Sequence, residues 1–126
     1  MHISRGMRIM PSNVCTEIVA PRVLFRTGSF PNPDHFTTDF CALSPELVHF
    51  LADKGVVLIG IDTPSVDPCT SKKLESHQAI AKRDLAILEG IVLQDVDAGV
   101  YRLMAFPLRI EGADATPVRA VLEKLT

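Results

Sequence analysis

Residues 56–61 place the tightest constraint on the fold. They read VVLIGI, so no polar side chain occurs at six successive positions, and Gly55 and the Thr63-Pro64 pair bound the run. A strand with one face in water alternates apolar and polar residues, whereas an uninterrupted apolar run of this length is typical of a strand covered on both faces. Such strands occur mainly in sheets with helices packed against them. We therefore expect an α/β fold.

The remaining pattern supports this class. Strands are expected at residues 23–27, 86–93 and 100–108, with Pro107 weakening the end of the last one. Ser44 has the features of an N-cap, followed by Pro45 and Glu46, for a helix that Gly55 ends. A second helix is expected at about residues 71–83. A last helix is expected from a Thr116-Pro117 cap onward, because residues 118, 121, 122 and 125 are apolar at helical spacing.

Length and charge restrict the function classes. The 126 residues, 47% of them hydrophobic, suit one domain, which we expect to be incomplete: an irregular start at residues 1–20, then residues 21–126. Thirteen basic and fifteen acidic side chains are well mixed, which argues against nucleic-acid or membrane partners. Three cysteines without a CxxC pair, and no secretory signal or membrane span, favour the cytoplasm.

Glu89 is the most informative single residue. It interrupts residues 86–93, a strand that is otherwise apolar on both faces. An unpaired buried carboxylate would cost several kcal/mol, so Glu89 needs a cation, a metal or dense hydrogen bonding. A structural salt bridge with Arg26 or Arg102 is the alternative to a functional role.

His77 is the natural partner of Glu89. It lies three and four residues from Leu74 and Ala81 on the second expected helix, and so shares their inward face. A lone histidine there is more often a hydrogen-bonded core residue than a ligand. Imidazole nitrogen and carboxylate oxygen are nevertheless ligands that suit Zn²⁺ or Mn²⁺. We predict that His77 and Glu89 form part of a metal site, since catalytic zinc generally takes three protein ligands.

Other candidate residues carry weaker signals. His2 is terminal, His35 lies in a proline-rich loop and His49 falls on a helix face that we expect to be solvated. Asp62 and Asp67 flank a turn, where aspartate normally caps backbone groups, and Cys69 lacks a partner at zinc-finger spacing. No phosphate-binding loop or nucleophile elbow is present in the sequence.

Several segments in order resemble the bacterial kynurenine formamidase branch of the cyclase family of metal-dependent hydrolases. They are residues 23–28 (VLFRTG), 60–65 (GIDTPS), 71–77 (SKKLESH), 87–93 (ILEGIVL) and 112–119 (GADATPVR). The similarity extends over about residues 20–125. Several motifs in order are far more specific than any single one.

The resemblance implies an α/β arylformamidase, usually homodimeric, that hydrolyses N-formyl-L-kynurenine to L-kynurenine and formate in tryptophan breakdown. It implies two zinc ions, with His77 and Glu89 on ligands of the second zinc. The family motif His-x-Gly-Thr-His-x-Asp and the acid/base histidine after it do not occur in this sequence. The resemblance therefore covers the C-terminal part of the family fold, a mixed sheet with helices, and the chain by itself is expected to be nearly inactive.

Two alternatives stay open. In the first, the chain belongs to the same family but the substrate is a different amide, for instance a cyclic amide of the isatin type that is hydrolysed with one Mn²⁺. The chain can also be a non-catalytic domain that pairs with another chain and keeps His77 and Glu89 as a polar core pair. The amide that a full-length version hydrolyses would distinguish the first alternative from a formamidase. An in-frame upstream DNA segment that encodes the missing motif would argue for an error in the start site, whereas random or out-of-frame DNA would favour a true fragment.

Overall fold

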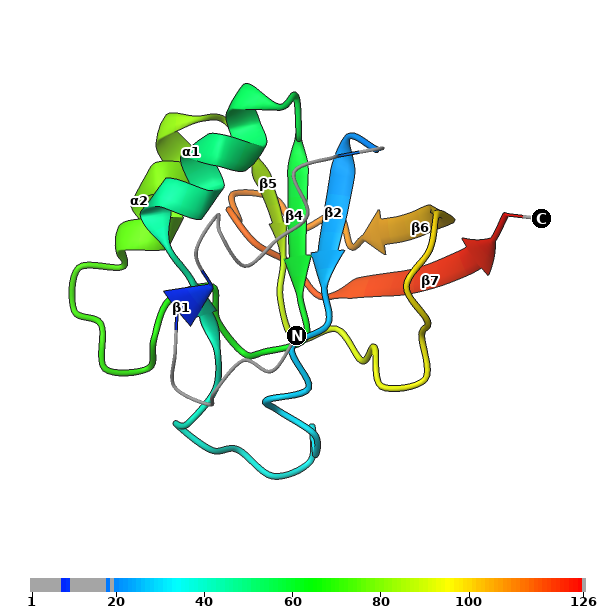
Figure 1. The fold of residues 1–126 in the computed structure, drawn as a ribbon, viewed down its shortest axis with the longest axis horizontal. Coiled ribbons are helices and arrows are strands. Elements are labelled where there is room, and N and C mark those ends of the chain that lie inside the picture. Colours follow the sequence, from blue (N-terminus) through cyan, green and yellow to red (C-terminus); the bar gives the residue numbers. More distant parts are fainter. Residues whose placement is uncertain (1–7, 10–17, 19, 126) are drawn as a thin grey trace. The chain divides into compact units, whose positions relative to one another are not determined.

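A three-stranded parallel sheet lies at the centre of the fold. The structure is a computed structural model that describes residues 8–9, 18 and 20–125. The sheet has the order β2 (Arg22–Phe25), β4 (Leu58–Ile61) and β5 (Ala86–Leu88), with Ile59 of β4 aligned with Val23 and Ile87. The apolar run at residues 56–61 thus supplies the middle strand of the sheet, and the α/β prediction is confirmed (Figure 1).

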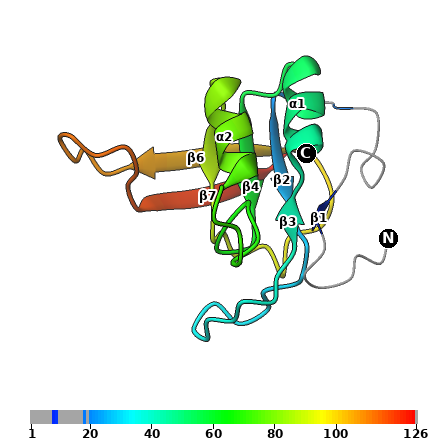
Figure 2. The same cartoon turned by 90° about the vertical axis from the view of Figure 1, so that its left-hand side faces the viewer.

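Two helices cover one face of this sheet. They are α1 (Pro45–Asp53) and α2 (Glu75–Lys82), and Figure 2 shows them side by side in front of β2 and β4. Ile59 and Ile61, two residues apart on β4, are fully buried in the core together with residues of both helices, such as Leu47 and Ile80. Alternation along a strand places Gly60 on the opposite face.

The first helix follows the sequence signals closely. The Ser44 hydroxyl accepts a hydrogen bond from Leu47 N, Pro45 occupies the first turn and Gly55 follows the end with a positive φ of 85°. The second helix begins at Glu75, four residues later than expected. Its N-cap position is Leu74, which has left-handed backbone angles and no side-chain cap, while the Ser71 hydroxyl accepts from Leu74 N in the preceding turn.

The third strand is shorter than predicted. β5 ends at Leu88, although Gly90 N and Ile91 N still donate to the carbonyls of Thr63 and Ile61. Gly90 has a positive φ of 66°, which turns the backbone out of the strand conformation. The expected strand at residues 86–93 is therefore confirmed only in its first part.

A short parallel bridge involves the start of the chain. β1 (Arg8–Ile9) pairs with β3 (Ala42–Leu43), and Ile9 is buried in the core. The other residues of the expected irregular start fall outside the described part of the chain, apart from Ile18 and Ala20.

Residues 96–126 form a compact unit separate from residues 1–95. It consists of an antiparallel hairpin of β6 (Tyr101–Pro107) and β7 (Val118–Lys124), in which Leu103 is aligned with Leu122. The predicted last helix is wrong. Along β7 residues 118–122 are alternately half-buried and exposed, and pairing with β6 satisfies the backbone groups on one edge of the strand.

Within the described residues, no helix has the length and apolar character needed to cross a membrane.

Candidate metal centre

Glu89 lies at the carboxyl end of β5. It directly follows Leu88, and by strand alternation its side chain leaves the sheet on the same face as Ile87, the face that the helices cover. The prediction of a buried residue on a central strand is wrong in two respects. Among the described strands β5 is an edge strand of its sheet, and 29% of the Glu89 side chain is exposed.

His77 reaches Glu89 from the first turn of α2. Its ring Nε2 lies 3.3 Å from Glu89 Oε1, and 32% of its side chain is exposed. Glu89 Oε1 also accepts a hydrogen bond of 2.9 Å from Val66 N, which fixes the carboxylate against the loop after β4. The expected convergence of the two side chains is therefore found, at a place that solvent and small ions can reach.

The donor atoms fit a divalent metal as part of its ligand set. Two ligand atoms on a tetrahedral zinc, each at about 2.0–2.1 Å from it, are separated by roughly 3.3 Å, and the separation of Nε2 and Oε1 is 3.3 Å. Among the described residues, however, no group of three or more His, Cys, Asp or Glu side chains can hold a metal ion. The two side chains form a partial site.

Asp67 holds His77 from the other side of the ring. The carboxylate is fully buried, and its Oδ2 lies 2.8 Å from His77 Nδ1 and accepts from His77 N at 3.0 Å. Oδ1 accepts from Ser76 N at 2.9 Å. Burial acts to raise the pKa of Asp67, but the hydrogen bonds from Ser76 and His77 outweigh it, so the pKa lies below its usual value.

Asp67 is the residue whose importance the sequence pattern did not reveal. We predicted a turn-capping role for Asp62 and Asp67, and both carboxylates do accept backbone N–H groups. The ring contact to His77 was not foreseen, because ten residues separate the two. The one signal that could have indicated it is the start of α2, where Leu74 cannot cap the helix and another side chain must accept the free N–H groups.

The remaining candidates lie apart from this pair. Asp62 accepts from Thr27 N and Gly28 N and so holds the loop after β2. His35 is exposed in its loop, Cys69 is an exposed free thiol, and His2 lies outside the described residues. Arg102, which the sequence offered as a salt-bridge partner of Glu89, pairs with Glu123 across the hairpin at 2.7 Å.

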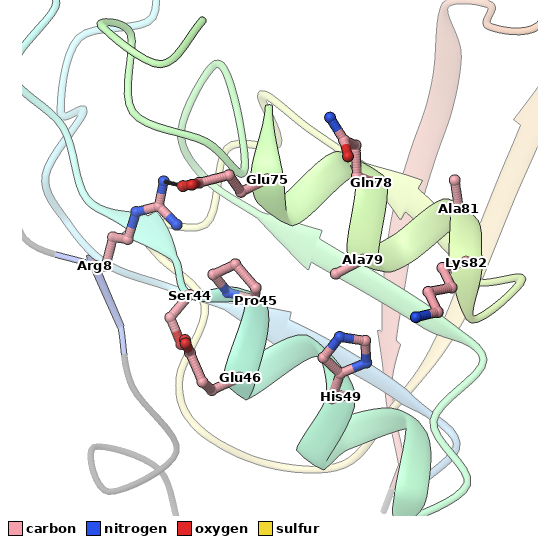
Figure 3. Close-up of a pocket in the computed structure, with 10 residues that line it drawn as sticks. All are labelled: Arg8, Ser44, Pro45, Glu46, His49, Glu75, Gln78, Ala79, Ala81 and Lys82. Carbon is pink, nitrogen blue, oxygen red and sulfur yellow. Dashed lines mark hydrogen bonds and ion pairs between the residues drawn. The ribbon is translucent and has the colours of Figure 1, made fainter. Parts of the chain in front are cut away.

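A groove between α1 and α2 is a separate feature. Figure 3 shows Arg8 paired with Glu75 at one end and Lys82 at the other, with Glu46 and His49 contributed by α1. His49 is therefore half-buried along this groove and not on a fully solvated face. Neither His77 nor Glu89 lines the groove, so it is distinct from the candidate metal centre.

Comparison with known proteins places these residues in a family context. The Cyclase family model matches residues 16–68. The chain is 47% identical over 122 residues to the kynurenine formamidase of Bordetella petrii, which covers 95% of this chain and 58% of that protein. It is 51% identical over 105 residues to the kynurenine formamidase of Bordetella pertussis, covering 83% of this chain and 50% of that protein.

Solved structures agree in fold. One of a potential metal-dependent hydrolase with cyclase activity superposes with a TM-score of 0.81 at 29% identity, covering 91% of this chain and 57% of the other. One of a predicted metal-dependent hydrolase from Bacillus stearothermophilus gives the same TM-score and identity, covering 56% of that chain. This chain is therefore similar to cyclase-family hydrolases in sequence and fold, and it spans about half the length of the curated relatives it matches.

Proposed function

We propose that this relative of the cyclase family contributes part of the active site of an arylformamidase, a metal-dependent hydrolase that cleaves N-formyl-L-kynurenine to L-kynurenine and formate. The substrate is taken from the kynurenine formamidases, which are 47–51% identical to this chain. The isatin-type and non-catalytic alternatives have no comparable support in the contacts of the described residues or in these relatives.

The observation that carries the proposal is the pairing of His77 and Glu89. Two side chains from different elements, α2 and the end of β5, present a nitrogen and an oxygen 3.3 Å apart at a partly exposed edge of the sheet. In open α/β sheets, ligands bind outside the carboxyl ends of the strands, and Glu89 lies at such an end. We assign His77 and Glu89 as two ligands of a zinc ion.

Each side chain has a defined part in the proposed reaction. A bound divalent metal supplies Lewis-acid polarisation of a carbonyl oxygen. His77 provides a neutral nitrogen ligand, Glu89 provides a negative oxygen ligand, and Val66 N holds the Glu89 carboxylate in place. Hydrolysis adds water across the formamide C–N bond and releases formate and the arylamine. Further ligands and a proton donor to that amine belong to residues beyond this pair.

The finer assignments rest on the family relationship. We propose zinc as the metal, a homodimer as the assembly, a role in tryptophan breakdown and a cytoplasmic location. The two solved relatives support a metal in general terms, because they are described as metal-dependent hydrolases. The substrate implied by the relatives is a small molecule.

Titration of the chain with Zn²⁺ tests the ligand assignment. We expect weak binding, because two protein ligands leave most of the coordination sphere to water. His77→Gln and Glu89→Gln should each abolish it, whereas His49→Gln, on the groove between the helices, should leave it unchanged. Binding that survives both ligand substitutions would refute the assignment.

Activity requires a second experiment. The chain alone should hydrolyse N-formylkynurenine barely above background. Joined to the part of the Bordetella petrii enzyme that it does not match, it should become active, and His77→Gln or Glu89→Gln should then remove most of the activity. A joined protein that folds but hydrolyses only cyclic amides would overturn the substrate assignment.

A further inference from the structure

We propose that Asp67 is the positioning residue of the metal centre, and that it fixes the tautomer of His77 so that the unprotonated Nε2 faces Glu89. The proposal rests on the metal-ligand part of the proposed function and extends it to a residue that does not itself contact the metal position. It concerns the direction in which His77 presents its lone pair.

The argument begins with the contact between the two side chains. Asp67 Oδ2 lies 2.8 Å from His77 Nδ1, and an ionised carboxylate can only accept a hydrogen bond. Asp67 is held as a carboxylate by two further donors, Ser76 N and His77 N, and the Arg8 guanidinium lies 3.7 Å away. Nδ1 must therefore carry the proton, and in the neutral ring Nε2 is left with a lone pair.

The second step concerns the rigidity of the arrangement. One oxygen of Asp67 binds both the backbone N–H and the ring of His77, so the ring is fixed relative to the start of α2. Asp67 is fully buried, and α2 has no local side-chain cap at Leu74. The Asp67 carboxylate thus both caps helix α2 and orients the His77 ring. A change in one of these interactions therefore affects the other.

The third step concerns Glu89. Its Oε1 already accepts from Val66 N and lies 3.3 Å from Nε2. With Nε2 unprotonated, two electron-pair donors face each other, an arrangement that a cation between them makes favourable. With the proton on Nε2, His77 would instead donate to Glu89, and both ligand atoms would be occupied by that hydrogen bond.

Nitrogen NMR of the metal-free 126-residue chain tests the tautomer directly. Long-range ¹H–¹⁵N spectra distinguish protonated from unprotonated ring nitrogens, and loss of the signals in His77→Gln identifies His77. Recorded at alkaline pH, where the signals no longer change, the wild-type ring should have its proton on Nδ1. A wild-type ring with its proton on Nε2 would overturn the proposal, and the His77→Gln variant serves only to assign the signals.

Two matched substitutions separate positioning from general structural support. Asp67→Asn replaces an acceptor with an amide that can donate to Nδ1, so the proton should move towards Nε2. Zn²⁺ binding, followed by the same NMR signals, should weaken about 10- to 100-fold. Asp62→Asn changes another buried aspartate that accepts backbone N–H groups, and should leave both readouts unchanged.

The outcomes distinguish this proposal from the proposed function. An Asp67→Asn chain that keeps the wild-type tautomer and the wild-type Zn²⁺ affinity overturns the positioning role. A wild-type chain with the Nδ1–H tautomer but no Zn²⁺ binding overturns the metal assignment and supports the orientation by Asp67.

Discussion

Asp67 and His77 are joined twice through one oxygen atom: Oδ2 accepts from the backbone N of His77 at 3.0 Å and lies 2.8 Å from its ring Nδ1. The contact links the loop after β4 to the first turn of α2, and β4 carries the central part of the core. The orientation of the candidate metal ligand is thereby tied to the part of the fold that is most deeply buried.

Asp67→Asn should destabilise the chain. The amide nitrogen would face N–H donors of Ser76 or His77, leaving at least one buried donor without an acceptor, at a cost of about 3 kcal/mol. Urea unfolding followed by circular dichroism measures the change. Asp53→Asn is the control at the other end of α2, where an exposed pair with Arg83 contributes about 0–1 kcal/mol. Equal losses in the two variants would contradict the prediction.

The stability of the chain should fall in acid partly because of Asp67. Its pKa is lower in the folded protein than the ordinary value of about 3.9 in the unfolded chain. The unfolded state therefore binds the proton more readily, so the contribution is fully present above about pH 4 and is lost as the pH falls through the folded pKa. Urea midpoints between pH 6 and pH 3 should decline less in Asp67→Asn than in Asp53→Asn. An identical decline would exclude Asp67 as a source.

Gly60→Ala should disrupt the face of the sheet opposite the helices. A Cβ at position 60 would overlap the Leu24 side chain and lie 3.2 Å from Ile91 Cδ1. Overpacking of this kind costs about 1–3 kcal/mol. Gly99→Ala is the matched control, because the nearest atom to its added Cβ is at 3.5 Å, an ordinary contact. A thermal midpoint for Gly60→Ala equal to that of Gly99→Ala would show that Leu24 moves aside freely.

The two sequences that look like helix caps should behave differently. Ser44→Ala removes the acceptor of Leu47 N at the start of α1 and should cost about 1–2 kcal/mol. Thr116 precedes a strand, and its hydroxyl donates to the carbonyl of the adjacent Pro117, so Thr116→Ala should change the free energy of unfolding by less than about 0.5 kcal/mol. A loss at Thr116 comparable to that at Ser44 would favour a helix at the C-terminus.

Local signals in the sequence were sufficient to predict helix α1 and the central residues of the parallel strands. Ser44, Pro45 and Gly55 act on the backbone within one turn, and the uninterrupted apolar run at residues 56–61 favours a strand that is buried on both faces. Glu89 was identified by the same reasoning, because a carboxylate in an apolar segment requires a partner.

The tertiary structure alone decided the features that depend on distant residues. Residues 118–125 carry apolar side chains at helical spacing, but pairing with β6 selects the strand, in which residues 118–122 are alternately half-buried and exposed. The start of α2 depends on Asp67, which lies seven residues before Leu74 and reaches the helix through the fold. The exposure of Glu89 depends on which strand ends the sheet. The sequence predicted that His77 and Glu89 belong together, and the fold determined which way the His77 ring faces, because its Nδ1 lies at hydrogen-bonding distance from the buried Asp67 carboxylate.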